Sequence, residues 1–145
     1  MDTTVADDST ARPPGYSHDI LWIFDADGVN QAFAYTVGLA VRPGRAYELA
    51  CTTLPAELAR AVLNNAAAQL VADNADPTEG LELSEVLEGF PVRLRRVRET
   101  GEFKGMRARF GEQPPVSVWQ VLFPDRRGRF PGHPRYDETL PQRLL

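Results

Sequence analysis

A β-strand is predicted by the stretch Phe33-Ala34-Tyr35-Thr36-Val37-Gly38-Leu39. Its large side chains alternate with Ala, Thr and Gly, and successive side chains of a strand point to opposite faces of the sheet. One face of this strand is therefore expected to be large and the other small. Another part of the chain is expected to pack closely over Thr36 and Gly38.

Further strand patterns lie on both sides of this stretch. The tight-turn signal Asp27-Gly28 lies between the apolar residues 20–24 and a second strand within 29–39. The two strands and the turn together predict a hairpin. The segment 81–89 is acidic and is either a connector or a short extended segment. Other elements are predicted by their patterns at 47–53 (strand), 91–97 (strand), 102–110 (short helix) and 116–123 (strand).

One main helix is predicted at about 54–73. Thr53 is placed to serve as its N-cap, with Pro55 in the first turn. The apolar positions recur every four residues along one face, at Leu58, Val62, Ala66 and Leu70.

These elements predict an α+β fold, with a mostly antiparallel sheet of about five to six strands and the helix packed on one face. A chain of 145 residues with 43% hydrophobic residues suits one domain, expected at 16–145. Residues 1–15 are acidic and polar, and are expected to form a disordered tail.

The composition excludes several classes of protein. Residues 1–92 hold 14 acidic residues against 4 arginines, a net charge of −10, whereas residues 93–145 hold 12 basic against 6 acidic residues, a net charge of +6. The total of −4 disfavours nucleic acid as a partner, and no apolar run reaches the length of a membrane span, so a cytoplasmic protein is expected. The single cysteine, Cys51, and two histidines give no metal-site spacing, and no cofactor motif is present, so neither metal nor cofactor is expected.

Two signatures in this order resemble those of a bacterial family known as domain of unknown function 4262 (DUF4262). Its members carry a "YTVGL" strand early, as at Tyr35–Leu39, and a "pDxxGxFP" turn late, as at Pro124–Pro131. The resemblance covers roughly residues 16–145. It implies an architecture and no reaction.

The chain departs from the family pattern at two places. The family's "HPEL" segment corresponds here to Arg45-Ala46-Tyr47-Glu48-Leu49, so a histidine and a proline are absent. Gly132 stands where a tryptophan commonly follows the late motif. Any family chemistry that depends on that histidine could not operate here.

The late turn is the strongest candidate site. One interpretation is structural: Asp125 caps the turn, Gly128 supplies a positive φ angle and Phe130 pins the loop to the core. The other is an anion-binding rim in which guanidinium groups bind a phosphate or carboxylate. In that rim the ligand-binding residues are Arg126, Arg127 and Arg129, and the catalytic candidates are Asp125 and His133.

The early strand offers a second choice. Tyr35 and Thr36 either pack and hydrogen-bond within the sheet or bind a ligand whose approach Gly38 allows. If the two signatures meet in space, Thr36, Asp125 and Arg129 could line one pocket.

Two functions remain open from the sequence. The first is a non-catalytic module that binds a ligand or a protein, because no catalytic constellation is recognisable. The alternative is a small enzyme that acts on an anionic, phosphate- or carboxylate-bearing metabolite through the arginine-rich late turn. We favour the binding module, whose partner is an unknown anionic small molecule or a protein.

Overall fold

A computed structural model describes residues 2–6, 19–24, 33–39, 47–98, 103, 117–139 and 142–145. Two predicted features lie outside the described residues: the turn at Asp27-Gly28, and the helix at 102–110 apart from Phe103.

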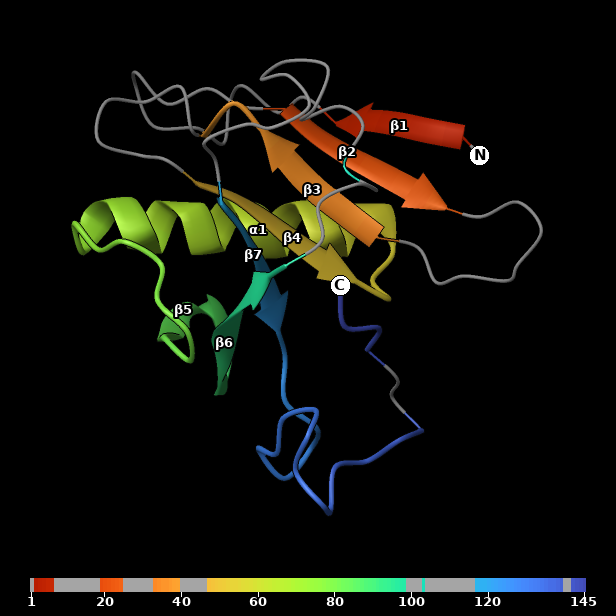
Figure 1. The fold of residues 1–145 in the computed structure, drawn as a ribbon, viewed down its shortest axis with the longest axis vertical. Helices are drawn as coiled ribbons and strands as arrows, with labels where there is room; N and C mark the ends of the chain where they lie inside the picture. The colour runs from red at the N-terminus through yellow and green to blue at the C-terminus, as the bar shows by residue number, and fades with distance from the viewer. Residues whose placement is uncertain are drawn as a thin grey trace.

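The described strands form one seven-stranded sheet in the order β1-β2-β3-β4-β7-β6-β5 (Figure 1). All neighbouring strands are antiparallel except β4 and β7, which are parallel. The predicted α+β class with a mostly antiparallel sheet is thus confirmed. The strands are β1 (Asp2–Ala6), β2 (Asp19–Phe24), β3 (Phe33–Val37), β4 (Tyr47–Thr52), β5 (Glu82–Leu87), β6 (Phe90–Val97) and β7 (Ser117–Leu122).

Strand β1 is the addition to the five or six predicted strands, and it lies within the predicted disordered tail. Its register with β2 runs from Asp2 opposite Phe24 to Ala6 opposite Ile20. Strand pairing uses main-chain N–H and C=O groups, so a polar segment with little to bury can still add to an open sheet edge. The structure therefore differs from the prediction over these five residues, and residues 7–15 lie outside the described part.

Strand β5 lies in the segment 81–89, for which the sequence allowed either a connector or a short extended segment. Leu87 lies opposite Phe90, and Gly89 between them has a φ of 86°. The pairing is irregular between Leu83 and Leu87, which breaks the alternation that would have marked a strand. The outer edge is bonded to the helix, because the N–H of Glu85 donates to Oε1 of Gln69 at 2.8 Å.

The sheet separates two apolar clusters. Helix α1 (Ala56–Ala72) crosses one face, where its buried side chains pack against residues such as Leu49 of β4 and Val121 of β7 (Figure 1). The opposite face buries Phe33, Tyr35 and Phe103. Because both faces are covered, β3 and β4 are buried along their whole length.

The start of α1 differs from the prediction. Pro55 is the N-cap residue in extended conformation, and it makes no side-chain capping hydrogen bond. The predicted N-cap, Thr53, lies two residues further out with a φ of 75°. At the other end, Asn74 has a φ of 50°, and the N–H of Ala75 donates to the carbonyl of Leu70, a left-handed stop that Asn tolerates.

The predicted apolar face of α1 is wrong at the start of the helix, where Ala59 is buried in place of Leu58. Leu58 is 46% exposed, whereas Val62 and Leu70 are buried as predicted. Each step of four residues turns an α-helix 40° beyond a full turn, so Leu58 lies about 120° away from Leu70. The buried face follows the mixed spacing of three and four, at Ala59, Val62, Leu63, Ala66, Ala67 and Leu70.

Two leucines of α1, Leu58 and Leu63, give a direct test of this face. Leu63→Ala is expected to lower the free energy of unfolding by about 2 to 5 kcal/mol, because Leu63 is 0% exposed and its loss leaves a cavity. Leu58→Ala on the same helix is expected to cost less than about 0.5 kcal/mol. Urea titration of both variants measures the difference; equal costs would place the wrong face inward.

Candidate functional site

The early signature surrounds a buried carboxylate of β4. Glu48 is 0% exposed. Its Oε1 accepts hydrogen bonds from Oγ1 of Thr36 at 2.8 Å and from the N–H of Leu39 at 3.0 Å, and its Oε2 accepts one from the N–H of Gly38 at 3.0 Å. The close packing expected over Thr36 and Gly38 is therefore made by the Glu48 side chain.

Tyr35 is also committed to the interior. Its side chain is 1% exposed, stacks on Phe33 with ring centroids 5.9 Å apart, and meets the edge of Phe103 at 5.0 Å. Thr36 is 0% exposed, and its hydroxyl also accepts the N–H of Leu49 at 2.9 Å. Both ligand-binding candidates of the early strand, Tyr35 and Thr36, are thus buried in the interior.

The two signatures do not meet. Thr36 and Gly38 contact Glu48 near the start of β4, whereas the late turn follows the end of β7. Because β4 and β7 run parallel, those positions lie at opposite ends of the sheet (Figure 1). The structure therefore does not form the pocket considered for Thr36, Asp125 and Arg129.

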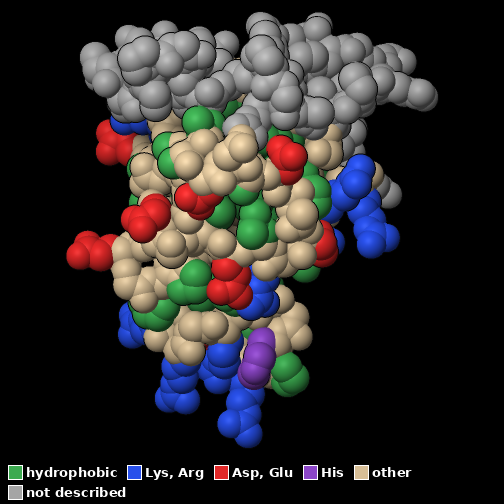
Figure 2. Space-filling model, turned by 90° about the vertical axis from the view of Figure 1, so that its left-hand side faces the viewer, with side chains coloured by type: hydrophobic (Ala, Val, Ile, Leu, Met, Phe, Trp, Pro, Cys, Tyr) green, Lys and Arg blue, Asp and Glu red, His purple; other side chains and the backbone are tan. Residues whose placement is uncertain are grey.

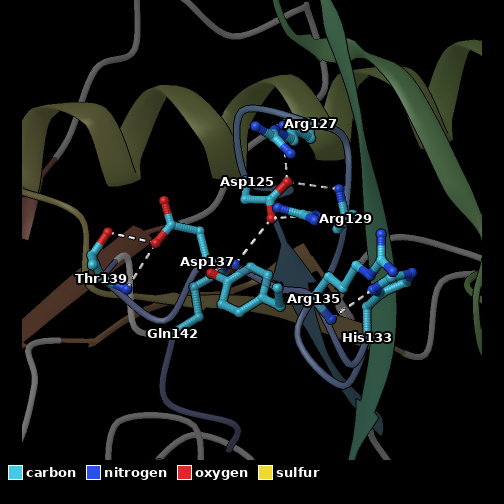
Figure 3. A network of polar contacts seen from close by, with 9 residues as sticks. Asp125, Arg127, Arg129, His133, Arg135, Asp137, Thr139 and Gln142 are labelled. Carbon is cyan, nitrogen blue, oxygen red and sulfur yellow. Dashed lines mark hydrogen bonds and ion pairs between the residues drawn. The ribbon is translucent and has the colours of Figure 1, made fainter.

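The late turn is organised around Asp125, which is 2% exposed (Figure 3). Oδ1 accepts the N–H groups of Arg127 and Arg129, both at 2.9 Å. Oδ2 accepts Nε of Arg129 at 2.9 Å and the N–H of Asp137 at 3.0 Å. One carboxylate therefore ties together three points of the loop.

These contacts set the charge of Asp125. Burial alone would raise its pKa, but the N–H groups of Arg129, Asp137 and Arg127 and the Arg129 side chain outweigh burial and hold the pKa well below its usual range. A carboxylate so fully occupied is poorly suited to accept a proton in catalysis.

The turn has each feature of the structural interpretation. Asp125 caps it, Gly128 has a φ of 79°, and Phe130 is 6% exposed. The N–H of Asp125 also donates to the carbonyl of Arg129 at 2.8 Å, which closes the loop. A glycine is needed at position 128 because residues with a side chain rarely adopt this backbone conformation.

Arg93 of β6 joins the turn to the sheet, and sequence reasoning missed it as a site residue. Its guanidinium carbon lies 4.1 Å from the centre of the Phe130 ring, and its Nη2 is 2.9 Å from Oε2 of Glu82. Arg93 is opposite Leu122 in the β6–β7 pairing, which brings it to the start of the turn. The sequence pattern predicted only that Arg93 lies in a strand at 91–97.

A hollow of about 460 Å³ lies beside this stack. Its charged side chains are Arg93 and Arg129, and the imidazole of His133 forms part of its wall. Of the three predicted arginines, Arg129 lines the hollow, whereas Arg126 and Arg127 are exposed on the loop outside its lining. Figure 2 shows Arg and Lys side chains and a histidine gathered at the lower end of the molecule.

His133 is held by its own loop. Its Nδ1 accepts the N–H of Arg135 at 3.0 Å (Figure 3). The neutral imidazole then carries its proton on Nε2. No dashed line joins His133 to Asp125 in Figure 3, so these two catalytic candidates are not hydrogen-bonded to each other.

Two glutamines, also missed from the sequence, fix the chain that follows the turn. Gln120 is 0% exposed; its Nε2 donates to the carbonyl of Arg143 at 2.7 Å, and its Oε1 accepts the N–H of Leu145 at 2.9 Å. The amide of Gln142 bonds both the N–H and the carbonyl of Phe123, as a neighbouring strand would. Residues 142–145 are thereby held against β7.

Residues 16–137 match the sequence family described as a domain of unknown function (DUF4262). The chain belongs to the DUF4262 family. Comparison with curated proteins and with solved structures finds no match. In this DUF4262 protein, the early signature supplies the donors to Glu48 and the late signature forms the turn around Asp125.

The described residues of this DUF4262 protein also bear on metal binding, thiol reactivity and membrane spanning. No group of three or more His, Cys, Asp or Glu side chains there is placed to hold a metal ion. Burial raises the pKa of the Cys51 thiol to about 12, which keeps it protonated and unreactive. Among the described residues, no helix is both long and apolar enough to cross a membrane.

Asp125→Asn tests the electrostatics of the turn. Because the folded pKa of Asp125 lies below the value of about 3.9 in an unfolded chain, its charge stabilises the fold fully above about pH 4 and progressively less as the pH falls. The variant is expected to melt several degrees lower at pH 7 and to lose less of its stability between pH 4 and 2.

Melting curves from pH 7 to pH 2 provide the measurement, with Glu138→Gln as the control for an exposed carboxylate of the same loop. Parallel curves for Asp125→Asn and the unmodified protein would contradict this assignment.

Proposed function

We propose that this protein is a non-catalytic binding module that captures an anionic group in the hollow between β6 and the late turn. The observation that carries the proposal is the lining: two arginines and a histidine, with no acidic residue among the described residues that line the hollow. Guanidinium groups bind phosphate and carboxylate through parallel N–H donors.

The internal pairing of these arginines leaves donors for a ligand. Arg129 uses its Nε for Asp125, and a guanidinium carries further N–H groups on its two terminal nitrogens. Arg93 pairs with Glu82 where both side chains are more than 40% exposed, and such surface pairs contribute little. Stacking on Phe130 also restricts the Arg93 guanidinium, which lowers the entropic cost of binding.

Binding is favoured over the alternative, a small enzyme that acts on an anionic metabolite. Asp125 is occupied by four hydrogen bonds and its pKa is lowered, so it is a poor general base. A catalytic pair would require a carboxylate that orients the imidazole of His133, and Asp125 does not supply it.

Melting temperature in phosphate or citrate, against chloride of matched ionic strength, tests the proposal. A ligand that binds only the native state stabilises it by mass action. With a Kd of about 1 mM, about 20 mM phosphate raises the free energy of unfolding by about 1.8 kcal/mol. That corresponds to an increase of about 4 to 7 °C for a chain of this size.

The double variant Arg93→Gln/His133→Ala is expected to lose the phosphate-specific increase. Arg127→Ala removes one positive charge from the same loop but lies outside the hollow, so it is expected to keep most of the increase. Equal melting temperatures in phosphate and chloride for the unmodified protein would exclude an anion site.

A further inference from the structure

The basic hollow has a neighbour. A second hollow of about 500 Å³ lies on the other side of Pro131, Gly132 and His133, which line both. The main chain at Gly132 has a φ of 100°, and the space where a side chain would begin is open. The segment 131–133, here called the ridge, therefore lies between the two hollows and carries no side chain at its centre, Gly132.

The second hollow has a different chemistry. Its apolar wall includes Pro134 and Leu144, and Leu144 is 46% exposed, one of three large hydrophobic side chains exposed in the described part of the chain. Tyr136 is positioned there by Gln142, whose Nε2 donates to the tyrosine hydroxyl at 2.9 Å. An exposed apolar surface beside a polar rim is typical of an interaction site.

The two hollows differ in the charge of the residues that line them. Arg93 and Arg129 line the first hollow, and Glu138 lines the second. An anionic group is attracted to the first and repelled from the second, whereas an apolar group is favoured beside Leu144.

The shape favours an extended chain over an engulfed small molecule. The ridge and the walls are exposed at Gly132, His133, Pro134 and Glu138, so the two hollows form a surface groove. Small-molecule sites usually bury most of the ligand surface, whereas peptides lie along open grooves.

We infer that the ligand is an extended peptide segment of a partner protein, with an anionic side chain in the basic hollow and a nearby apolar side chain against Leu144. This inference rests on the proposed anion site and adds the class of partner and the second contact. The ridge at Gly132 lets the peptide main chain cross between the hollows.

Fluorescence anisotropy with labelled peptides tests the inference on the full chain. The probes are X-(Gly)n-Leu-amide peptides that carry the fluorophore on the N-terminal amine, in which X is phosphoserine or glutamate and n runs from 0 to 3. At the best spacing, replacing the peptide leucine with alanine is expected to weaken binding about tenfold, as loss of a partly buried leucine contact would.

The matched protein variants are Leu144→Ser and Leu58→Ser, because both leucines are 46% exposed and only Leu144 lines the groove. Leu144→Ser is expected to weaken the leucine peptide about tenfold and to leave the alanine peptide unchanged. Leu58→Ser is expected to change neither affinity.

Three outcomes would overturn the inference. They are no spacing at which Leu144→Ser affects binding, equal loss for both peptides, and an oligonucleotide of eight thymidines that displaces the best peptide as effectively as unlabelled peptide does. If phosphate still raises the melting temperature in those cases, the anion site stands without the peptide. If phosphate has no effect either, both proposals fail.

Discussion

The structure depends on carboxylates that are buried and then surrounded by main-chain donors. A buried carboxylate costs several kcal/mol unless hydrogen bonds replace the water it loses. Asp125 meets this requirement with three N–H groups and one guanidinium, and Glu48 meets it with two N–H groups and a hydroxyl. In both cases the main-chain donors come from irregular backbone, so the carboxylate holds in place segments that no helix or strand pairing would fix.

This constraint gives both family signatures a structural role. The early signature supplies the donors to Glu48, and the late signature forms the turn around Asp125, so the most recognisable residues hold the fold together. The surface proposed for binding is built on the outside of that turn, from Arg93, Arg129 and the ridge at 131–133. A rigid loop is a suitable place for such a site, because little conformational freedom is lost on binding.

The sequence predicted the elements whose hydrophobic period is regular. Strands at β3, β4, β6 and β7 and the main helix follow from alternation and helical spacing. Strand β1 was missed because its pairing uses the main chain and its sequence is polar, and Leu58 was misplaced because a spacing of four drifts around the helix.

The candidate site was predicted only in part, for a different reason. The residues that cap and close a turn lie within the turn motif itself. The roles of Asp125, Gly128 and Phe130 could therefore be predicted from the sequence. Arg93 and Gln142 reach the site through the pairing of β6 with β7 and through the chain after the turn. Contacts between residues distant in sequence leave no local pattern, which is also why Tyr35 and Thr36 could not be placed in advance.

Hydrogen exchange of the main-chain amides tests most directly whether buried carboxylates fix these irregular segments. We predict that the amides of Gly38 and Leu39, which donate to Glu48, exchange as slowly as amides inside β4 and β7. The same is expected of the amides of Arg129 and Asp137, which donate to Asp125. The exposed Glu138 in the same loop provides the comparison for fast exchange. Exchange of the four amides at the rate of Glu138 would show that the buried carboxylates do not fix these segments.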